Sequence, residues 1–185
     1  MTTAEQKSAA RKAAFIRRKA AHRLGDHTGH LRELIGAVQG KVIAGYMPIR
    51  TEIDPLPAMA ALSLTNRIAV PVIQGAGQAL VFHEWMPGAE MIAGPFGAQI
   101  PQDGRPLVPD LLIVPLVAFE ARCYRLGYGG GFYDRTLEGL RARDTVRAYG
   151  FAYAAQLVET LPLEPTDQPL DAIATDAGIL QPPDA

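Results

Sequence analysis

Residues 110–119 read DLLIVPLVAF, a nearly continuous apolar run that decides the fold class. The run has the length of a strand, and a strand that is apolar on both sides is typical of a sheet covered on both faces. A glycine-rich segment, residues 125–134 (RLGYGGGFYD), follows it and leads into a predicted helix over residues 132–143. A buried strand, a glycine-rich turn and a helix in this order favour an α/β fold whose ligands bind beyond the carboxyl ends of the strands.

Strands and helices alternate along the rest of the chain. Sequence patterns predict strands over residues 41–47, 67–73, 79–85 and 145–153, helices over 4–24, 31–38 and 56–64, a loop over 87–109, and one or two short pieces in the tail, 161–185. The alternation predicts a three-layer α/β/α architecture with a mainly parallel sheet. Because no internal repeat or long linker divides the chain, we expect a single domain over residues 1–185.

The predicted N-terminal helix carries two contrasting stripes. The apolar stripe consists of Ala9, Ala13, Ile16, Ala20 and Leu24, and the basic stripe of Lys7, Arg11, Arg18 and His22. Periodicity alone predicts that the apolar stripe faces the core and the basic stripe faces solvent. The alternative for Lys7 and Arg11, which lie one helical turn apart, is that both reach one polyphosphate.

The composition is that of an ordinary globular protein. A net charge of −1, with 48% apolar and 20% charged residues, argues against a protein that coats nucleic acid or membrane. Cys123 is the only cysteine, which excludes an intrachain disulfide and a cysteine-based zinc cluster. The sequence lacks an apolar stretch that could span a membrane and the apolar run of a secretory signal. We therefore expect a cytoplasmic enzyme without nucleic-acid or membrane partners.

The glycine-rich segment has the chemistry of a phosphate-binding turn. Glycines let main-chain amides approach phosphate oxygens, and the N-terminus of the following helix adds positive potential. Arg125 can neutralise phosphate charge, and Asp134 offers a hard oxygen ligand suited to Mg²⁺. The segment lacks the Lys-Ser/Thr pair of the common phosphate loop, and Phe132 stands where the dinucleotide fingerprint has its third glycine. The alternative is a flexible turn, with Asp134 as a helix cap.

Further motifs accompany this segment along the chain. They are Lys7-x-x-x-Arg11, Tyr46-Met47-Pro48 followed by Glu52-Ile53-Asp54, the strand at 109–115 (PDLLIVP), and Asp167 with Asp171 near the end. Together with the pattern Arg-x-Gly-x-Gly-x-Gly-Phe/Tyr-Tyr-Asp, they resemble the signature of the 5-formyltetrahydrofolate cyclo-ligase (methenyltetrahydrofolate synthetase) family. The resemblance covers nearly the whole chain, and the glycine motif with Glu-Ile-Asp at this spacing is quite specific.

The resemblance implies a fold and an activity. The implied fold is a three-layer α/β/α arrangement of the NagB/RpiA/CoA-transferase-like type. The implied enzyme uses ATP and Mg²⁺ to cyclise 5-formyltetrahydrofolate to 5,10-methenyltetrahydrofolate, with release of ADP and phosphate. The formyl oxygen would attack the γ-phosphoryl group and the substrate's N10 would then close the ring, so no protein nucleophile is required. We expect a monomer or a weak homodimer.

The resemblance also assigns roles to individual residues. It places ATP contacts at Lys7, Arg11, Arg125, Leu126, Gly127, Tyr128, Gly129, Gly130, Gly131, Phe132 and Tyr133, metal contacts at Asp134 and Asp167, and reduced-folate contacts at Met47, Glu52, Tyr128, Phe132, Phe82 and Phe96. Glu52 would accept hydrogen bonds from N–H groups of the pterin. The alternatives are a surface acid for Glu52, a turn residue for Asp167, and ordinary core side chains for Met47 and the aromatic residues.

Two positions depart from the family pattern. Some members carry Arg and Lys where this chain has Tyr128 and Gly130, and Arg122 or Arg135 is a candidate to replace those charges. A competing function is a non-catalytic nucleotide-binding regulatory module, which would keep the glycine segment but lack a second ligand pocket. An RNA-binding role is disfavoured because the net charge is near zero and no recognised RNA-binding motif is present.

Overall fold

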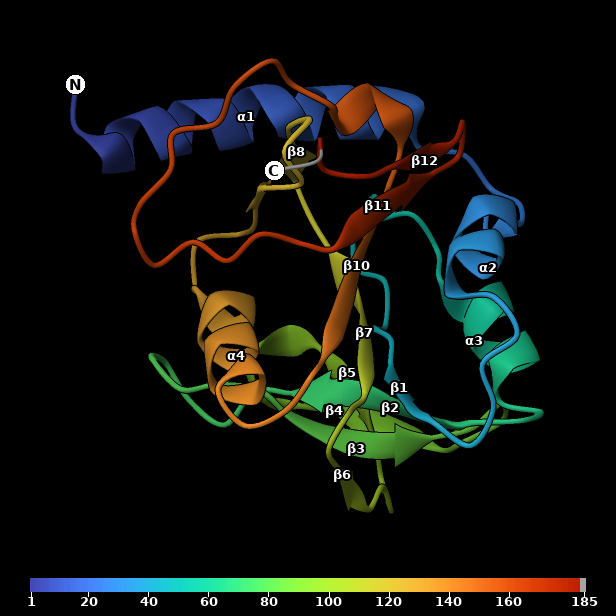
Figure 1. The fold of residues 1–185 in the computed structure, drawn as a ribbon. Coiled ribbons are helices and arrows are strands. Elements are labelled where there is room, and N and C mark those ends of the chain that lie inside the picture. Colours follow the sequence, from blue (N-terminus) through green and yellow to red (C-terminus); the bar gives the residue numbers. More distant parts are fainter. Residues whose placement is uncertain (184–185) are drawn as a thin grey trace.

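The computed structural model describes residues 1–183, which are organised around one mixed β-sheet (Figure 1). Across these residues the main sheet has eight strands in the order β12-β11-β10-β7-β1-β2-β3-β6. The strands are β1 (Val42–Ala44), β2 (Arg67–Val72), β3 (Val81–Trp85), β6 (Pro106–Leu107), β7 (Leu111–Pro115), β10 (Arg147–Ala152), β11 (Ala172–Thr175) and β12 (Ile179–Leu180). The set from β11 to β2 is parallel, and β12 and β3 flank it in antiparallel orientation. The prediction of an α/β fold with a mainly parallel sheet is confirmed.

Strand β7 lies inside the sheet because its side chains are apolar on both faces. It pairs with β1 on one side and with β10 on the other. Leu111 and Ile113 pack into one core cluster, whereas Leu112 and Val114 pack into a second cluster. All four side chains are buried. The alternation of side chains along a strand therefore gives the sheet two apolar faces, each of which requires a cover.

Helices provide that cover and complete three layers (Figure 1). The helices are α1 (Thr3–Ala21), α2 (Gly29–Ile35), α3 (Leu56–Leu62) and α4 (Phe132–Arg141). Leu31 of α2 and Met59 of α3 pack with the cluster on one face, and Leu137 of α4 packs with the cluster on the other. Fully burying such a side chain contributes about 1.5–3 kcal/mol, so these contacts hold the helices on the sheet. The NagB/RpiA/CoA-transferase-like assignment stays a prediction.

Helix α1 crosses the carboxyl-terminal edge of the sheet instead of covering a face (Figure 1). It contacts β8 (Ala118–Phe119) and the 3-10 turn η2 (Ala154–Gln156), which follow the ends of β7 and β10. A capping box begins the helix, because the Thr2 side chain accepts a hydrogen bond from the Glu5 amide and the Glu5 side chain accepts one from the Thr2 amide.

The predicted orientation of this N-terminal helix was wrong. All members of the apolar stripe (Ala9, Ala13, Ile16, Ala20 and Leu24) are exposed, and Ile16 retains 72% of its surface. Lys7 and Arg18 of the basic stripe are instead buried, with 8% and 1% exposure. The reason is the surface that the helix covers, because the strand-end loops offer oxygen atoms to Lys7 and Arg11 and an apolar patch to Ala14 and Phe15. His22 is exposed, as expected.

Two further segments differ from prediction, whereas the short pieces expected in the tail are present. Residues 87–109 are not only loop, because they hold the hairpin of β4 (Met91–Ala93) and β5 (Gln99–Pro101), the turn η1 (Pro95–Gly97) and strand β6. The run 110–119 divides into β7 and β8, and β8 pairs with β9 (Arg125–Leu126) just before the glycines. In the tail, β11 and β12 both join the main sheet, and residues 184–185 lie outside the described residues. Within residues 1–183, none of the helices is both long enough and apolar enough to cross a membrane.

Candidate functional site

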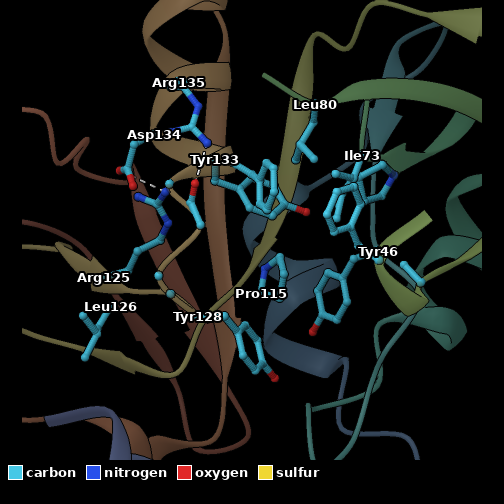
Figure 2. Close-up of a pocket in the computed structure, with 18 of the residues that line it drawn as sticks. Tyr46, Ile73, Leu80, Pro115, Arg125, Leu126, Tyr128, Tyr133, Asp134 and Arg135 are labelled. Atoms are coloured by element: carbon cyan, nitrogen blue, oxygen red, sulfur yellow. Dashed lines mark hydrogen bonds and ion pairs between the residues drawn. The ribbon is translucent and has the colours of Figure 1, made fainter. Parts of the chain in front are cut away.

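A cavity of about 780 Å³ lies at the carboxyl-terminal edge of the sheet. Its walls come from the segment after β1, the ends of β2 and β7, the glycine segment, α1, the start of α4, and residues 164–167. Figure 2 shows Arg125 and Asp134 on one side of this space, with Tyr46, Tyr128 and Tyr133 around it. This is the edge at which open α/β sheets bind ligands, and it is the edge that the sequence order predicted.

The glycine segment forms a tight turn between β9 and α4. Gly129 and Gly131 have φ angles of 107° and 65°, which residues with a side chain rarely adopt. The Arg11 Nε donates a hydrogen bond of 2.8 Å to the Gly127 carbonyl, so α1 is joined directly to the turn. Helix α4 begins at Phe132, immediately after the turn. The turn and the N-terminus of α4 therefore place main-chain amides and positive potential together at the cavity.

Replacing Gly129 by Ala is expected to destabilise the turn by about 1–3 kcal/mol. Ala at this position would have to adopt a φ of 107°, and its Cβ would lie 3.3 Å from the Arg11 guanidinium. We expect weaker nucleotide binding by calorimetry and a lower denaturation midpoint. The control is Gly139→Ala in α4, where nothing lies within 4 Å of an added Cβ. That change is expected to stabilise the helix by about 0.5–1 kcal/mol, and equal effects of the two substitutions would contradict the role of the turn.

Arg125 and Asp134 form an ion pair at the base of the turn. Arg125 is 7% exposed, and its Nη2 lies 3.0 Å from Asp134 Oδ1. The same carboxylate accepts a 2.9 Å hydrogen bond from the Gln168 amide, and Arg125 donates to the Gln168 carbonyl at 2.8 Å. Burial lowers the pKa of Arg125, and the charge of Asp134 opposes that shift. The pair holds both predicted ligand contacts in fixed positions.

Lys7 brings the N-terminal helix to the second predicted metal ligand. Its Nζ lies 2.8 Å from Asp167 Oδ2 and 2.7 Å from Glu164 Oε2. Burial disfavours the ammonium, but the hydrogen bonds to Asp167 and Glu164 outweigh it and raise the pKa of Lys7. Lys7 is therefore charged at neutral pH.

The two predicted metal ligands fit a metal that arrives with phosphate groups. Asp134 and Asp167 both line the cavity. Within residues 1–183, no three His, Cys, Asp or Glu side chains are grouped as a metal cage. Mg²⁺ is usually held by one or two carboxylates together with phosphate oxygens and water, so this pair of carboxylates suits Mg²⁺ bound to a nucleotide.

Glu52 marks a second region of the same cavity. It is 6% exposed, and one carboxylate oxygen accepts a 2.9 Å hydrogen bond from the Ile49 amide. Burial raises the pKa of Glu52, whereas that hydrogen bond and the charge of Arg18 lower it in part. Met47 lines the cavity beside it. A buried carboxylate next to an apolar wall can recognise a flat ligand that carries N–H donors.

Two tyrosines in this region differ in how their hydroxyls are bonded. Tyr46 donates a 2.7 Å hydrogen bond to the Ile53 carbonyl. The hydroxyl of Tyr133 is buried and has no hydrogen-bond partner among the described residues. Burial raises the pKa of Tyr133, so this hydroxyl is protonated at neutral pH. Tyr133 lines the cavity, and its hydroxyl is a hydrogen-bond donor that none of the described residues uses.

The aromatic residues expected to contact a folate do not all lie at the cavity. Phe96 and Phe132 line it, with ring centroids 6.5 Å apart. Phe82 is instead 3% exposed and packs in the core cluster with Leu80 and Leu112, because its side chain points from β3 toward the layer of α4. Phe82 is therefore an ordinary core aromatic, and its predicted contact with substrate was wrong.

Comparison with known proteins identifies the family of this chain. A sequence model of the 5-formyltetrahydrofolate cyclo-ligase family matches residues 4–176. The chain belongs to the 5-formyltetrahydrofolate cyclo-ligase family. The Escherichia coli 5-formyltetrahydrofolate cyclo-ligase is 36% identical over 150 residues, which cover 77% of this chain and 81% of that protein. The Haemophilus influenzae protein of the same name is 37% identical over 150 residues, covering 77% of this chain and 80% of its own.

Solved structures agree with the cyclo-ligase assignment. The Aquifex aeolicus 5,10-methenyltetrahydrofolate synthetase superposes with a TM-score of 0.74 at 26% identity, covering 97% of this chain and 94% of its own. The synthetase from Mycoplasma pneumoniae has a TM-score of 0.66 at 25% identity, covering 92% of this chain and 98% of its own. The fold predicted from the alternating strands and helices is thus that of solved methenyltetrahydrofolate synthetases.

The structure also resolves how this cyclo-ligase family member differs at the glycine segment. Arg135 lines the cavity and donates a hydrogen bond to the Gly130 carbonyl. Arg122 lies elsewhere, paired with Glu120 at 2.6 Å. Of the two candidates for replacing the missing cations, Arg135 is the one at the site. Tyr128 is 40% exposed, and its ring lies beneath the guanidinium of Arg50, 5.7 Å from the ring centroid.

Sequence reasoning did not find three residues that shape this cyclo-ligase cavity. Arg50 and Glu164 line it, but neither belongs to a motif that spacing alone would reveal. Arg18 was assigned to solvent, yet it is buried beside Tyr128. Its signal was available, because it continues the stripe of Lys7 and Arg11, and two stripe members at a site place the third near it.

Proposed function

We propose that this protein converts 5-formyltetrahydrofolate to 5,10-methenyltetrahydrofolate with ATP and Mg²⁺, releasing ADP and phosphate. The observation that carries the proposal is that one cavity joins a phosphate-type glycine turn to a separate buried carboxylate, Glu52. A nucleotide-binding regulatory module would need the first region only. Two regions in one space suit a reaction between two ligands.

The triphosphate is proposed to bind along the glycine turn. The residues of the turn and the start of α4 line the cavity, so their main-chain amides are proposed to bind phosphate oxygens, and Lys7, Arg11 and Arg125 supply positive charge. Asp134 and Asp167 would hold Mg²⁺, which neutralises charge on the phosphate oxygens. Lys7 and Arg125 now pair with these carboxylates, so each cation would turn toward phosphate as its partner binds the metal.

The reduced folate is proposed to bind on the Glu52 side. The carboxylate would accept hydrogen bonds from N–H groups of the pterin, and Met47, Phe96, Phe132 and Tyr128 would contact its apolar and aromatic parts. This arrangement places the formyl group between Glu52 and the glycine turn. The position matters because the formyl oxygen must reach the γ-phosphoryl group.

The proposed reaction uses groups of the two substrates only. The formyl oxygen attacks the γ-phosphoryl group, the bond to the bridging oxygen breaks, and ADP leaves. The substrate's N10 then attacks the activated formyl carbon and loses its proton, the carbon–oxygen bond breaks, and phosphate departs. The protein orients the reactants and balances charge, and effects of this kind are worth about 7–11 kcal/mol for well-oriented groups.

The test is an assay with purified protein, 5-formyltetrahydrofolate and Mg·ATP. We expect near-ultraviolet absorbance from the methenyl product together with an equal amount of ADP, and neither without the metal. If nucleotide binds but no product absorbance develops, the regulatory alternative is correct. We further propose that the reaction takes place in the cytoplasm, by a monomer or a weak homodimer.

Tyr133→Phe is expected to lower turnover about tenfold, the usual effect of one lost hydrogen bond to a ligand. The hydroxyl has no partner among the described residues, so its removal should leave the melting temperature unchanged or raise it. Steady-state kinetics and thermal unfolding measure the two effects. The control is Tyr124→Phe, because Tyr124 packs against Arg122 and does not line the cavity. Full activity of the Tyr133 variant would exclude a ligand contact by this hydroxyl.

A further inference from the structure

Arg18 is an unusual residue for the inner face of a helix. Its side chain is 1% exposed and is among the largest fully buried side chains of the protein. Its guanidinium lies 5.2 Å from the centroid of the Phe15 ring and 5.5 Å from that of Tyr128. It also donates hydrogen bonds to the Thr51 hydroxyl at 3.1 Å and to the Tyr128 hydroxyl at 2.8 Å. Arg18 therefore joins α1, the segment after β1 and the glycine turn.

The charge of this guanidinium is not balanced in the usual way. Among the described residues, no carboxylate lies within 4.0 Å of Arg18, and its buried Nη1 has no hydrogen-bond partner. A buried cation without an ion pair is costly, and proteins generally pair such groups. Aromatic rings on two sides recover part of that cost. The contacts of Arg18 within the fold therefore do not explain why an Arg is buried at this position.

The two groups that Arg18 holds are linked to the residues proposed to contact folate. Thr51 directly precedes Glu52, and Tyr128 is itself a cavity residue. Two hydrogen bonds from one planar guanidinium fix their relative position, because its N–H groups have a rigid fork geometry. The positive charge also lowers the pKa of Glu52 against the effect of burial.

We propose that Arg18 is a positioning residue that sets the folate-binding geometry, by clamping Tyr128 to the Thr51–Glu52 segment. It acts through these residues and does not touch the substrate. The proposal rests on the proposed function, because Glu52 and Tyr128 are taken as folate contacts. It predicts that loss of Arg18 weakens folate binding selectively, while the nucleotide side, held by Lys7, Arg11 and Arg125, is little affected.

The experiment compares Arg18→Met, Arg18→Lys and Tyr128→Phe with Lys19→Met, an exposed cation on the same helix. For Arg18→Met we expect the KM for 5-formyltetrahydrofolate to rise about tenfold or more, with kcat and the KM for Mg·ATP within about twofold. Arg18→Lys keeps the charge without the fork, so it should restore part of the loss. Lys19→Met should match the natural protein. Thermal unfolding reports any general loss of structure.

A double-mutant cycle decides whether the clamp is real. If Arg18 acts through the Tyr128 hydroxyl, the two substitutions should not be independent. The folate KM of the double variant, Arg18→Met with Tyr128→Phe, should then exceed that of the natural protein by much less than the product of the two single increases. Multiplicative effects, or an unchanged folate KM in Arg18→Met, would overturn the proposal. Should Arg18→Met fail to fold, Tyr128→Phe and Thr51→Ala test the same clamp, and an unchanged folate KM in both would overturn it equally.

These outcomes are separate from failure of the proposed function. Natural protein that forms product while Arg18→Met keeps the natural folate KM refutes only the clamp. Natural protein that forms no product refutes the cyclo-ligase activity, and calorimetric titration with 5-formyltetrahydrofolate then tests the clamp by binding alone. If the natural protein neither binds folate nor forms product, both proposals are wrong.

Discussion

Asp134→Asn is expected to lower turnover about 100-fold at ordinary Mg²⁺ concentrations and to raise the Mg²⁺ concentration needed for half-maximal rate. The side chain lines the cavity and pairs with Arg125 at 3.0 Å, so it is held at the place where phosphates are proposed to bind. Asn keeps an oxygen that can accept from the Gln168 amide, but it lacks the charge that binds a hard cation. The measurement is initial rate against Mg²⁺ concentration at saturating ATP.

The control for this substitution is Asp103→Asn, an exposed aspartate outside the cavity lining. It should leave both the rate and the Mg²⁺ dependence unchanged. Because Arg125 loses its ionic partner in Asp134→Asn, some loss of stability is also expected, and thermal unfolding should be recorded for both variants. Unchanged turnover and unchanged Mg²⁺ dependence in Asp134→Asn would remove this residue from the metal site.

Glu52→Gln is expected to raise the KM for 5-formyltetrahydrofolate about 10- to 100-fold, which corresponds to a lost hydrogen bond to a charged group. The KM for Mg·ATP should change little, because the glycine turn is not altered. Glu159→Gln is the control, since Glu159 is exposed and outside the cavity lining. Equal folate KM values for the Glu52 variant and the natural protein would place the pterin elsewhere.

Although Glu52→Gln is expected to weaken folate binding, it is not expected to destabilise the fold. Burial raises the pKa of Glu52 above the ordinary value of 4.5. A group whose pKa is raised by folding stabilises the protein below its ordinary pKa, and that contribution is lost as the pH rises through the raised value. At a pH above the raised pKa the ionised Glu52 therefore weakens the fold, and there Gln should keep or increase the melting temperature. The difference between the two proteins should shrink as the pH falls toward 4.

The central strand and the glycine turn could be predicted from the sequence, because both depend on residues that are neighbours in the chain. The strand at residues 111–115 is apolar on both faces and had to lie inside a sheet. The glycine turn, Arg125 and Asp134 lie within ten consecutive residues, so their proximity needed no knowledge of the fold. The cavity also combines them with Glu52 and Asp167, which the motif resemblance had predicted as members of one site.

The features that sequence alone did not predict depend on what lies across from a residue. The periodicity of α1 is real, but a helix at the edge of a sheet meets loops. There the basic side chains find oxygen partners and Ala14 is buried, while Ala9, Ala13 and Ala20 of the predicted apolar stripe remain exposed. Phe82 reads like any aromatic residue near a site, and only the direction of β3 shows that it belongs to the core. Arg18 required both pieces of information, the edge position of α1 and the location of Tyr128.

The pairing of Lys7 with Asp167 and of Arg125 with Asp134 has a consequence for the order in which ligands enter. Arg125 and Asp134 balance each other, and Lys7 lies between two carboxylates, Asp167 and Glu164, so the predicted metal ligands and two of the predicted phosphate contacts are already paired. Either one arriving alone must separate a pair and leave one member without a counterion. The metal–polyphosphate complex instead supplies phosphate oxygens to Lys7 and Arg125 and a metal ion to Asp167 and Asp134 at the same time. From these pairs we expect the protein to bind Mg·ATP more tightly than either ATP or Mg²⁺ alone.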